Sequence, residues 1–236
     1  MRIDAILSPP EIDLLPQRDL RETVCVVFDV LRATSSIVTA LANGAREIYP
    51  ASTIEEALAL RSKWPEAALG GERQGEKIDG FDLGNSPAEY AKKPPAKIIT
   101  TTTNGTVELR ACQGAGEVMA GALLNMDALV RRLTARPPER LLLVCAGSFR
   151  ATALEDVFAA GMLCASLEKD CSMSDAATVC GAVFSRYRGN TLGALEESQN
   201  GQALKRNGRT DDVKWCARES VYAVLGIMKE GVIRDV

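Results

Sequence analysis

Residues 24–45 read VCVVFDVLRATSSIVTALANGA, and this stretch predicts the local architecture of the chain. Its first five residues, 24–28, are apolar and rich in β-branched side chains, which is typical of a strand buried on both faces. An amphipathic helix follows to about Asn43 and ends at Gly44, a residue suited to the position after a helix. We therefore expect a buried strand, a polar turn and a helix.

The polar turn carries Asp29, Arg32, Thr34 and Ser35. In open α/β sheets, ligands bind beyond the carboxyl ends of the strands. A carboxylate, a guanidinium and hydroxyls at a helix N-terminus suit a metal ion and a phosphate. The alternative is an ordinary turn capped by Asp29 or Thr34, with Arg32 in solvent. This stretch alone leaves both interpretations open.

Strand and helix patterns alternate along the rest of the chain. The expected strands are 2–7, 47–50, 67–71, 97–101, 117–120, 141–145 and 223–228, and the expected helices include 53–64, 125–135, one ending at Gly161 and 174–182. This alternation predicts an α/β fold with a mixed, largely parallel sheet flanked by helices. We expect a single domain over 1–236, and a division into two similar lobes, 1–135 and 139–236, stays open.

Composition excludes several classes of function. The chain has 236 residues, a net charge of −3 and no histidine. The acidic balance argues against nucleic-acid binding, and the apolar runs are too short for a membrane span. The N-terminus lacks the profile of a signal peptide, so we expect a cytoplasmic protein. Seven cysteines without a C-x-x-C pattern indicate buried thiols. The oligomeric state stays open, a homodimer included.

The absence of histidine narrows the chemistry. It removes imidazole metal ligands, phosphohistidine intermediates and nucleophiles paired with histidine. A metal site built from carboxylates, carbonyls and hydroxyls favours magnesium, manganese or calcium over zinc. Composition alone leaves these three cations open.

Two further stretches carry polar groups. Residues 70–87, GGERQGEKIDGFDLGNSP, hold five glycines and four acids, and we expect an irregular loop that is functional or mobile. Residues 100–106, TTTTNGT, place hydroxyls and N–H groups at a predicted strand-to-helix junction, which suits an oxyanion. The alternative for the second stretch is a β-branched strand end with an Asn-Gly turn.

These stretches together resemble one family. The matching blocks are DVLRAT (29–34), GERQG (71–75), GFDLGNSP (80–87), TTTNGT (101–106), CAG (145–147) and LEDV (154–157). In this order they resemble the 2-phosphosulfolactate phosphatases of coenzyme M biosynthesis. The resemblance implies a magnesium-dependent phosphoric monoester hydrolase that converts 2-phosphosulfolactate, a small anionic phosphoester, to 3-sulfolactate and phosphate.

Candidate site residues follow from these blocks and from the acids near them. The expected catalytic residues are Asp29, Arg32, Glu72 and Asp82. The expected metal ligands are Asp29, Glu72, Asp79, Asp82 and Asp156. The expected substrate-binding residues are Thr34, Ser35, Arg73, Asn85, Ser86, Thr102, Thr103, Asn104, Gly105, Thr106, Gly147 and Ser148. Arg150 is a further candidate for anion binding.

The chain also departs from the family pattern. Thr34, Ser35 and Ser36 stand where the family has a threonine run, and the last strand lacks an expected proline. Asn200 replaces the histidine of a Ser-x-His-Gly stretch, so this position cannot supply a catalytic base. Two other functions stay open: a phosphatase or phosphotransferase acting on another phosphorylated hydroxy acid, and a non-catalytic binder of anionic metabolites.

Overall fold

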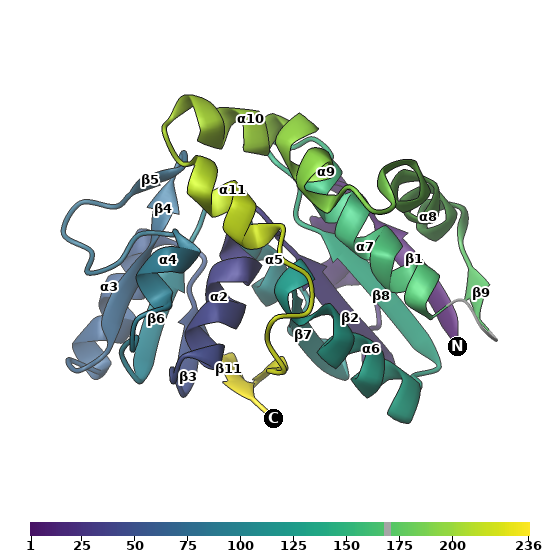
Figure 1. Ribbon diagram of the computed structural model, residues 1–236. Helices are drawn as coiled ribbons and strands as arrows, with labels where there is room; N and C mark the ends of the chain where they lie inside the picture. The colour runs from purple at the N-terminus through teal and green to yellow at the C-terminus, as the bar shows by residue number, and fades with distance from the viewer. Residues whose placement is uncertain (168–170) are drawn as a thin grey trace.

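The computed structural model describes residues 1–167 and 171–236, which form one sheet of eleven strands flanked by helices (Figure 1). The strands, in chain order, are β1 (Arg2–Ile6), β2 (Thr23–Phe28), β3 (Glu47–Pro50), β4 (Ala68–Arg73), β5 (Glu76–Lys77), β6 (Lys97–Thr101), β7 (Glu117–Gly121), β8 (Arg140–Cys145), β9 (Ser172–Met173), β10 (Gly226–Lys229) and β11 (Val232–Asp235). The α-helices are α1 (Pro9–Ile12), α2 (Ala33–Ala42), α3 (Ile54–Lys63), α4 (Pro87–Tyr90), α5 (Gly105–Ala111), α6 (Met126–Ala135), α7 (Leu154–Ser166), α8 (Asp175–Tyr187), α9 (Thr191–Glu197), α10 (Gln199–Arg206) and α11 (Thr210–Cys216).

Strand β2 lies inside the sheet, between β7 and β8 and parallel to both. Its side chains alternate between two cores, as the period of a strand requires. Val26 and Phe28 pack in the core that includes residues of α6, α7 and α8. Cys25 and Val27 pack in the core that includes residues of α2 and α5. The expected strand, buried on both faces, is confirmed.

The sheet contains two groups of parallel strands. One group is β7, β2, β8, β1 and β9, and the other is β3, β6 and β4. The antiparallel hairpin of β10 and β11 lies between them and pairs antiparallel with β7 and β3. The sheet is thus mixed and largely parallel, and the expected α/β class is confirmed. Strand β8 lies between β1 and β2, so both halves of the sequence build one sheet.

Two helices are longer than the sequence indicates. Helix α7 continues past Gly161 to Ser166. A Cβ atom on Gly161 would lie 2.0 Å from the carbonyl oxygen of Cys180, so this glycine permits close packing of α7 against α8 and does not end the helix. Helix α8 likewise runs to Tyr187, beyond the expected end at residue 182.

The acidic loop is more regular than expected. Strand β4 continues to Arg73, and β5 folds back to pair with it, Glu72 opposite Lys77. Gln74 and Gly75 join the two strands with φ angles of 54° and 84°. A two-residue turn with both φ angles positive matches the twist of a hairpin. Glutamine is not a typical residue for such a turn, so the hairpin was not predicted.

The last quarter of the chain contains elements that the sequence analysis did not predict. Helices α9 and α10 precede α11, and β11 completes the C-terminal hairpin. Figure 1 shows α10 and α11 above the region between the two groups of strands. No helix of the described residues is long and apolar enough to cross a membrane.

Candidate active site

The carboxyl ends of strands from both groups meet. The N–H of Gly105, which follows β6, donates a hydrogen bond to Oδ2 of Asp29, which follows β2, at 2.8 Å. These strands lie in different groups of the sheet, so tertiary structure alone brings them together. The two groups run in opposite directions, because three antiparallel pairings separate β7 from β3, and the folded chain nonetheless brings Asp29 and Gly105 into contact.

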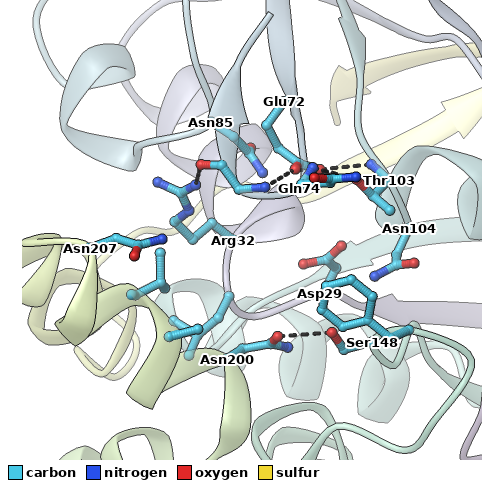
Figure 2. Close-up of a pocket in the computed structure, with 15 residues that line it drawn as sticks. Asp29, Arg32, Glu72, Gln74, Asn85, Thr103, Asn104, Ser148, Asn200 and Asn207 are labelled. Carbon is cyan, nitrogen blue, oxygen red and sulfur yellow. Dashed lines mark hydrogen bonds between the residues drawn. The ribbon is translucent and has the colours of Figure 1, made fainter.

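A cavity of about 130 Å³ lies at this meeting point. Its lining comes from four regions: the β2–α2 turn, the β4–β5 hairpin with the loop after it, the turns after β6 and β8, and helix α10 with its C-terminal end (Figure 2). The lining residues are Asp29, Leu31, Arg32, Glu72, Gln74, Gly75, Asn85, Thr103, Asn104, Ser148, Phe149, Asn200, Ala203, Leu204 and Asn207.

Asp29 is held in place by backbone N–H groups on both sides. Its Oδ1 accepts from Ala33 at 3.1 Å and its Oδ2 from Gly105. Burial raises the pKa of Asp29 to about 6; the two N–H groups lower it and the nearby charge of Glu72 raises it. Asp29 is therefore a buried carboxylate that titrates near neutral pH, and it lies in a cavity. Such a group is a candidate for catalysis or for metal binding.

Glu72 is the second carboxylate of the cavity. It is buried, and its Oε1 accepts from the N–H of Thr103 at 2.7 Å while its Oε2 accepts from the N–H of Gly75 at 2.7 Å. The β4–β5 hairpin thus positions Glu72 against the turn after β6. Two fixed carboxylates face one cavity, and each repels the negative charge of the other.

Arg32 lies at the same cavity and is buried, in contrast to the solvent-exposed alternative. Its guanidinium donates to Oδ2 of Asp212 at 2.6 Å and to the carbonyl of Gly75 at 2.9 Å. Asp212 also accepts from the hydroxyl of Ser86. The carboxylate of Asp212, on α11, thus binds the β2–α2 turn, 180 residues away in the chain. A buried cation is thereby paired.

The opposite wall contains a polar chain of three residues. The hydroxyl of Ser148 donates to Oδ1 of Asn200 at 2.9 Å, and Nδ2 of Asn200 donates to Oε1 of Glu155 at 2.6 Å. Figure 2 shows Ser148 and Asn200 across the cavity from Glu72. Burial raises the pKa of Glu155. Asn200 thus joins helix α10 to the turn after β8.

Asp156 has a role in holding two turns together. Its Oδ1 accepts from the N–H of Val30 and its Oδ2 from the N–H of Gly147, at 2.8 and 3.0 Å. It is buried, and burial raises its pKa well above the usual range. Asp156 does not line the cavity, so its contact with a metal ion there, expected from the sequence, has no support in the geometry.

The other expected residues divide into two groups. Besides Asp29, Arg32 and Glu72, those that line the cavity are Asn85, Thr103, Asn104 and Ser148. Those outside the lining are Thr34, Ser35, Arg73, Asp79, Asp82, Ser86, Thr102, Gly105, Thr106, Gly147 and Asp156. Several of the second group support the first: the Thr34 and Ser35 hydroxyls, for example, donate to carbonyls of the β2–α2 turn.

Asp82 and Asp79 lie away from the cavity. The carboxylate of Asp82 accepts from the N–H of Leu69 at 2.8 Å and from Arg61 at 2.9 Å, so it fastens the loop to β4. Asp79 is exposed on the same loop. Neither position supports the catalytic or metal-binding role expected from the sequence. Arg150 is also exposed and pairs with Asp13.

The threonine run uses its polar groups inside the protein. The N–H of Thr103 donates to Glu72 and that of Gly105 to Asp29, and Thr102 and Thr106 bond to each other through their hydroxyls and N–H groups. The anions at this helix start are therefore the protein's own carboxylates. Of the run expected to bind the oxyanion of a substrate, only Thr103 and Asn104 line the cavity.

Sequence reasoning missed several lining residues. Gln74 and Gly75 lie in the GERQG block, which was a usable signal. Asn200 was noticed only as the replacement of a histidine. The other missed residues are Leu31, Phe149, Ala203, Leu204 and Asn207. The three on α10 and its end carry no local signal, because only the tertiary fold places that helix over the cavity.

Comparisons with known proteins agree with the expected family. The family model described as 2-phosphosulpholactate phosphatase matches residues 11–231. Three relatives carry the name "Probable 2-phosphosulfolactate phosphatase". The chain is 36% identical to that of Caldanaerobacter subterraneus over 92% of each chain, 38% identical to that of Symbiobacterium thermophilum over 94% of this chain and 98% of the relative, and 39% identical to that of Deinococcus radiodurans over 93% of each. The chain with this cavity of fixed carboxylates therefore belongs to the 2-phosphosulpholactate phosphatase family, whose name describes phosphoric monoester hydrolases.

Proposed function

We propose that this protein hydrolyses 2-phosphosulfolactate to 3-sulfolactate and phosphate with the help of Mg²⁺. One observation carries the proposal: two fixed carboxylates, Asp29 and Glu72, face the same small cavity as the buried guanidinium of Arg32. Acids and a cation in one cavity suit a metal-bound phosphate. Family membership and the names of the relatives support the choice of substrate.

The donor set fits magnesium. Mg²⁺ takes one or two carboxylates, keeps several water molecules and binds substrate phosphate. Both oxygens of Asp29 and Oε1 of Glu72 each accept one backbone N–H group and retain a free lone pair, whereas Oε2 of Glu72 accepts from the N–H of Gly75 and from the hydroxyl of Thr103. Within residues 1–167 and 171–236, no group of three or more histidine, cysteine, aspartate or glutamate side chains is arranged to hold a metal. The site thus suits an open, hydrated ion and not a closed cage.

The three charged residues of the cavity then have different roles in the proposed reaction. Asp29 and Glu72 would hold the cation, which supplies stabilisation of the charge on the phosphoryl oxygens. Because N–H groups fix both oxygens of Asp29, we assign this carboxylate to orienting the attacking water and not to attacking phosphorus. Arg32 binds the phosphate through the guanidinium N–H groups that Asp212 and Gly75 leave free.

The test is phosphate release from 2-phosphosulfolactate by the purified protein. We expect turnover with Mg²⁺ or Mn²⁺, its loss in excess chelator and its return on adding magnesium. Asp29→Asn should abolish turnover. An acid quench during turnover should find no acyl-phosphate on the protein.

Full activity in excess chelator would remove the metal from the mechanism. Zinc restoring more activity than magnesium would contradict the all-oxygen site. A phosphorylated aspartate in the quench would reassign Asp29 to the nucleophile. Binding of 3-sulfolactate without phosphate release from any ester would establish the non-catalytic alternative.

A further inference from the structure

Asn85 is a buried polar residue without a polar partner for its side chain. It is 7% exposed and lines the cavity. Within the described part of the chain, its side-chain amide makes no hydrogen bond. Its backbone carbonyl, in contrast, accepts from the hydroxyl of Ser36 at 2.9 Å. Figure 2 shows Asn85 beside Arg32 and Glu72.

A buried amide normally has hydrogen-bond partners, because an unpaired one loses its hydration without compensation. Asn125, which is completely buried, follows this rule: its oxygen accepts from Ala122, and its nitrogen donates to two backbone carbonyls. Asn104 and Asn200, on the same cavity as Asn85, are also bonded. Asn85 therefore has an unused donor and acceptor that face the cavity.

The residues around Asn85 keep it rigid. Gly84 is fixed on one side, its N–H donating to Glu89 and its carbonyl accepting from Gly71. Ser86 is fixed on the other side by its hydrogen bond to Asp212. These contacts hold the backbone of Asn85, so binding a ligand through its side chain costs little backbone conformational entropy.

One neighbour of Asn85, Arg32, favours an anionic group as its partner. Arg32 supplies a positive charge at the same wall, and an amide N–H donates to carboxylate or sulfonate oxygens. We infer that Asn85 is a specificity-determining residue that donates its side-chain N–H to the non-reacting anionic group of the phosphoester, a carboxylate or a sulfonate. This inference rests on the proposed function for the identity of the ester.

The experiment compares Asn85→Ala and the volume-conserving Asn85→Leu with Asn125→Ala as the matched control. Phosphate release is measured with 2-phosphosulfolactate, 2-phospholactate (no sulfonate), phosphoisethionate (no carboxylate) and ethyl phosphate (neither). We expect both Asn85 variants to reduce kcat/KM for 2-phosphosulfolactate about tenfold, mainly through KM, since one charged hydrogen bond is lost. Ethyl phosphate should be hydrolysed as by the wild type.

Stability gives a second readout. The amide atoms of Asn85 have no hydrogen bond among the described residues and stay open to the cavity, so removing them should leave the urea midpoint of both Asn85 variants about unchanged, whereas Asn125→Ala should lower it. The substrate for which the loss disappears identifies the group: 2-phospholactate if Asn85 binds the sulfonate, phosphoisethionate if it binds the carboxylate. An Asn85 variant that is destabilised like Asn125→Ala, or that loses ethyl phosphate activity equally, overturns the inference.

The two proposals can fail separately. If the wild type releases no phosphate from 2-phosphosulfolactate, the proposed function fails. Asn85 is then tested by calorimetric binding of 3-sulfolactate and lactate to the protein with magnesium. Binding that is weakened in both Asn85 variants supports the inference. Equal binding by all proteins, or none by the wild type, overturns it.

Discussion

Asp29→Asn should stabilise this protein while abolishing its activity. The substitution removes the carboxylate of Asp29, and burial raises the pKa of this carboxylate from 3.8 to about 6. A raised pKa means that folding favours the protonated form. The stability contributed by Asp29 is therefore complete below pH 3.8 and is lost as the pH rises through 6. At neutral pH the ionised form of Asp29 lowers the free energy of unfolding by about 3 kcal/mol, because each unit of pKa shift corresponds to about 1.4 kcal/mol.

Asparagine resembles the protonated form of Asp29. Both asparagine and protonated aspartate keep one acceptor oxygen. In both, the second polar atom of the side chain becomes a donor, and it faces the N–H of Ala33 or of Gly105. Because asparagine does not ionise, the variant avoids the cost at neutral pH. At pH 7.5 it should be more stable than the wild type by up to about 3 kcal/mol, and this difference should shrink by about 2 kcal/mol at pH 4.5.

The assay is urea unfolding of both proteins from pH 4.5 to 7.5, extrapolated to water. Excess chelator is present, because a bound cation would favour the ionised form. Asp82→Asn is the control: hydrogen bonds, the one from Leu69 first, lower the pKa of Asp82. Asp82→Asn should therefore be less stable than the wild type, by an amount that shrinks as the pH falls.

Two results would refute the reasoning. One is an Asp29→Asn variant that is less stable than the wild type at pH 7.5, and the other is a stability difference that does not change with pH. Turnover supplies the functional half of the prediction, because loss of a required carboxylate should cost orders of magnitude in kcat. A folded Asp29→Asn variant that keeps most of its turnover would end the catalytic assignment, whereas Asp82→Asn should keep wild-type turnover.

Two other substitutions test the packing of the site. Gly105→Ala should destabilise the protein by about 1–3 kcal/mol and reduce kcat, because its Cβ would lie 2.6 Å from Oδ2 of Asp29 and 2.7 Å from the Cβ of Ala33; unchanged unfolding and kinetics would contradict this close contact. Arg32→Met should cost about 3–5 kcal/mol in denaturant unfolding, because it leaves Asp212 buried and unpaired. The double variant Arg32→Met/Asp212→Leu should recover most of that loss, and a purely additive result would show that the pair is not coupled.

Local sequence pattern predicted the α/β class and most of the strands. Residues 24–28 form the expected buried strand, and Gly44, with a φ of 112°, follows α2 as expected. Periodicity and turn chemistry are local properties, so the sequence displays them directly. The end of α7 was misjudged because Gly161 serves a contact with α8, and a single sequence does not distinguish a packing glycine from a terminating one.

The candidate site was predicted in part for a similar reason. Asp29, Arg32 and Glu72 stand at ends of elements that the sequence marks, and they line the cavity. Asp82 and Asp156 are acids in equally suggestive blocks, yet their carboxylates accept N–H groups that hold loops together. The type of a residue indicates what it can bind. Its partners in the fold decide whether that capacity remains free.

By itself, the sequence determined the alternation of strands and helices over most of the chain, the lack of imidazole chemistry and the resemblance to the family. The tertiary structure decided which polar ends meet. It turned the backbone N–H groups of the threonine run toward Asp29 and Glu72, placed α10 over the cavity and left the amide of Asn85 unpaired. These features depend on contacts between residues far apart in the chain, such as Arg32 with Asp212. No local pattern encodes such contacts, because their energy arises only when distant segments pack together.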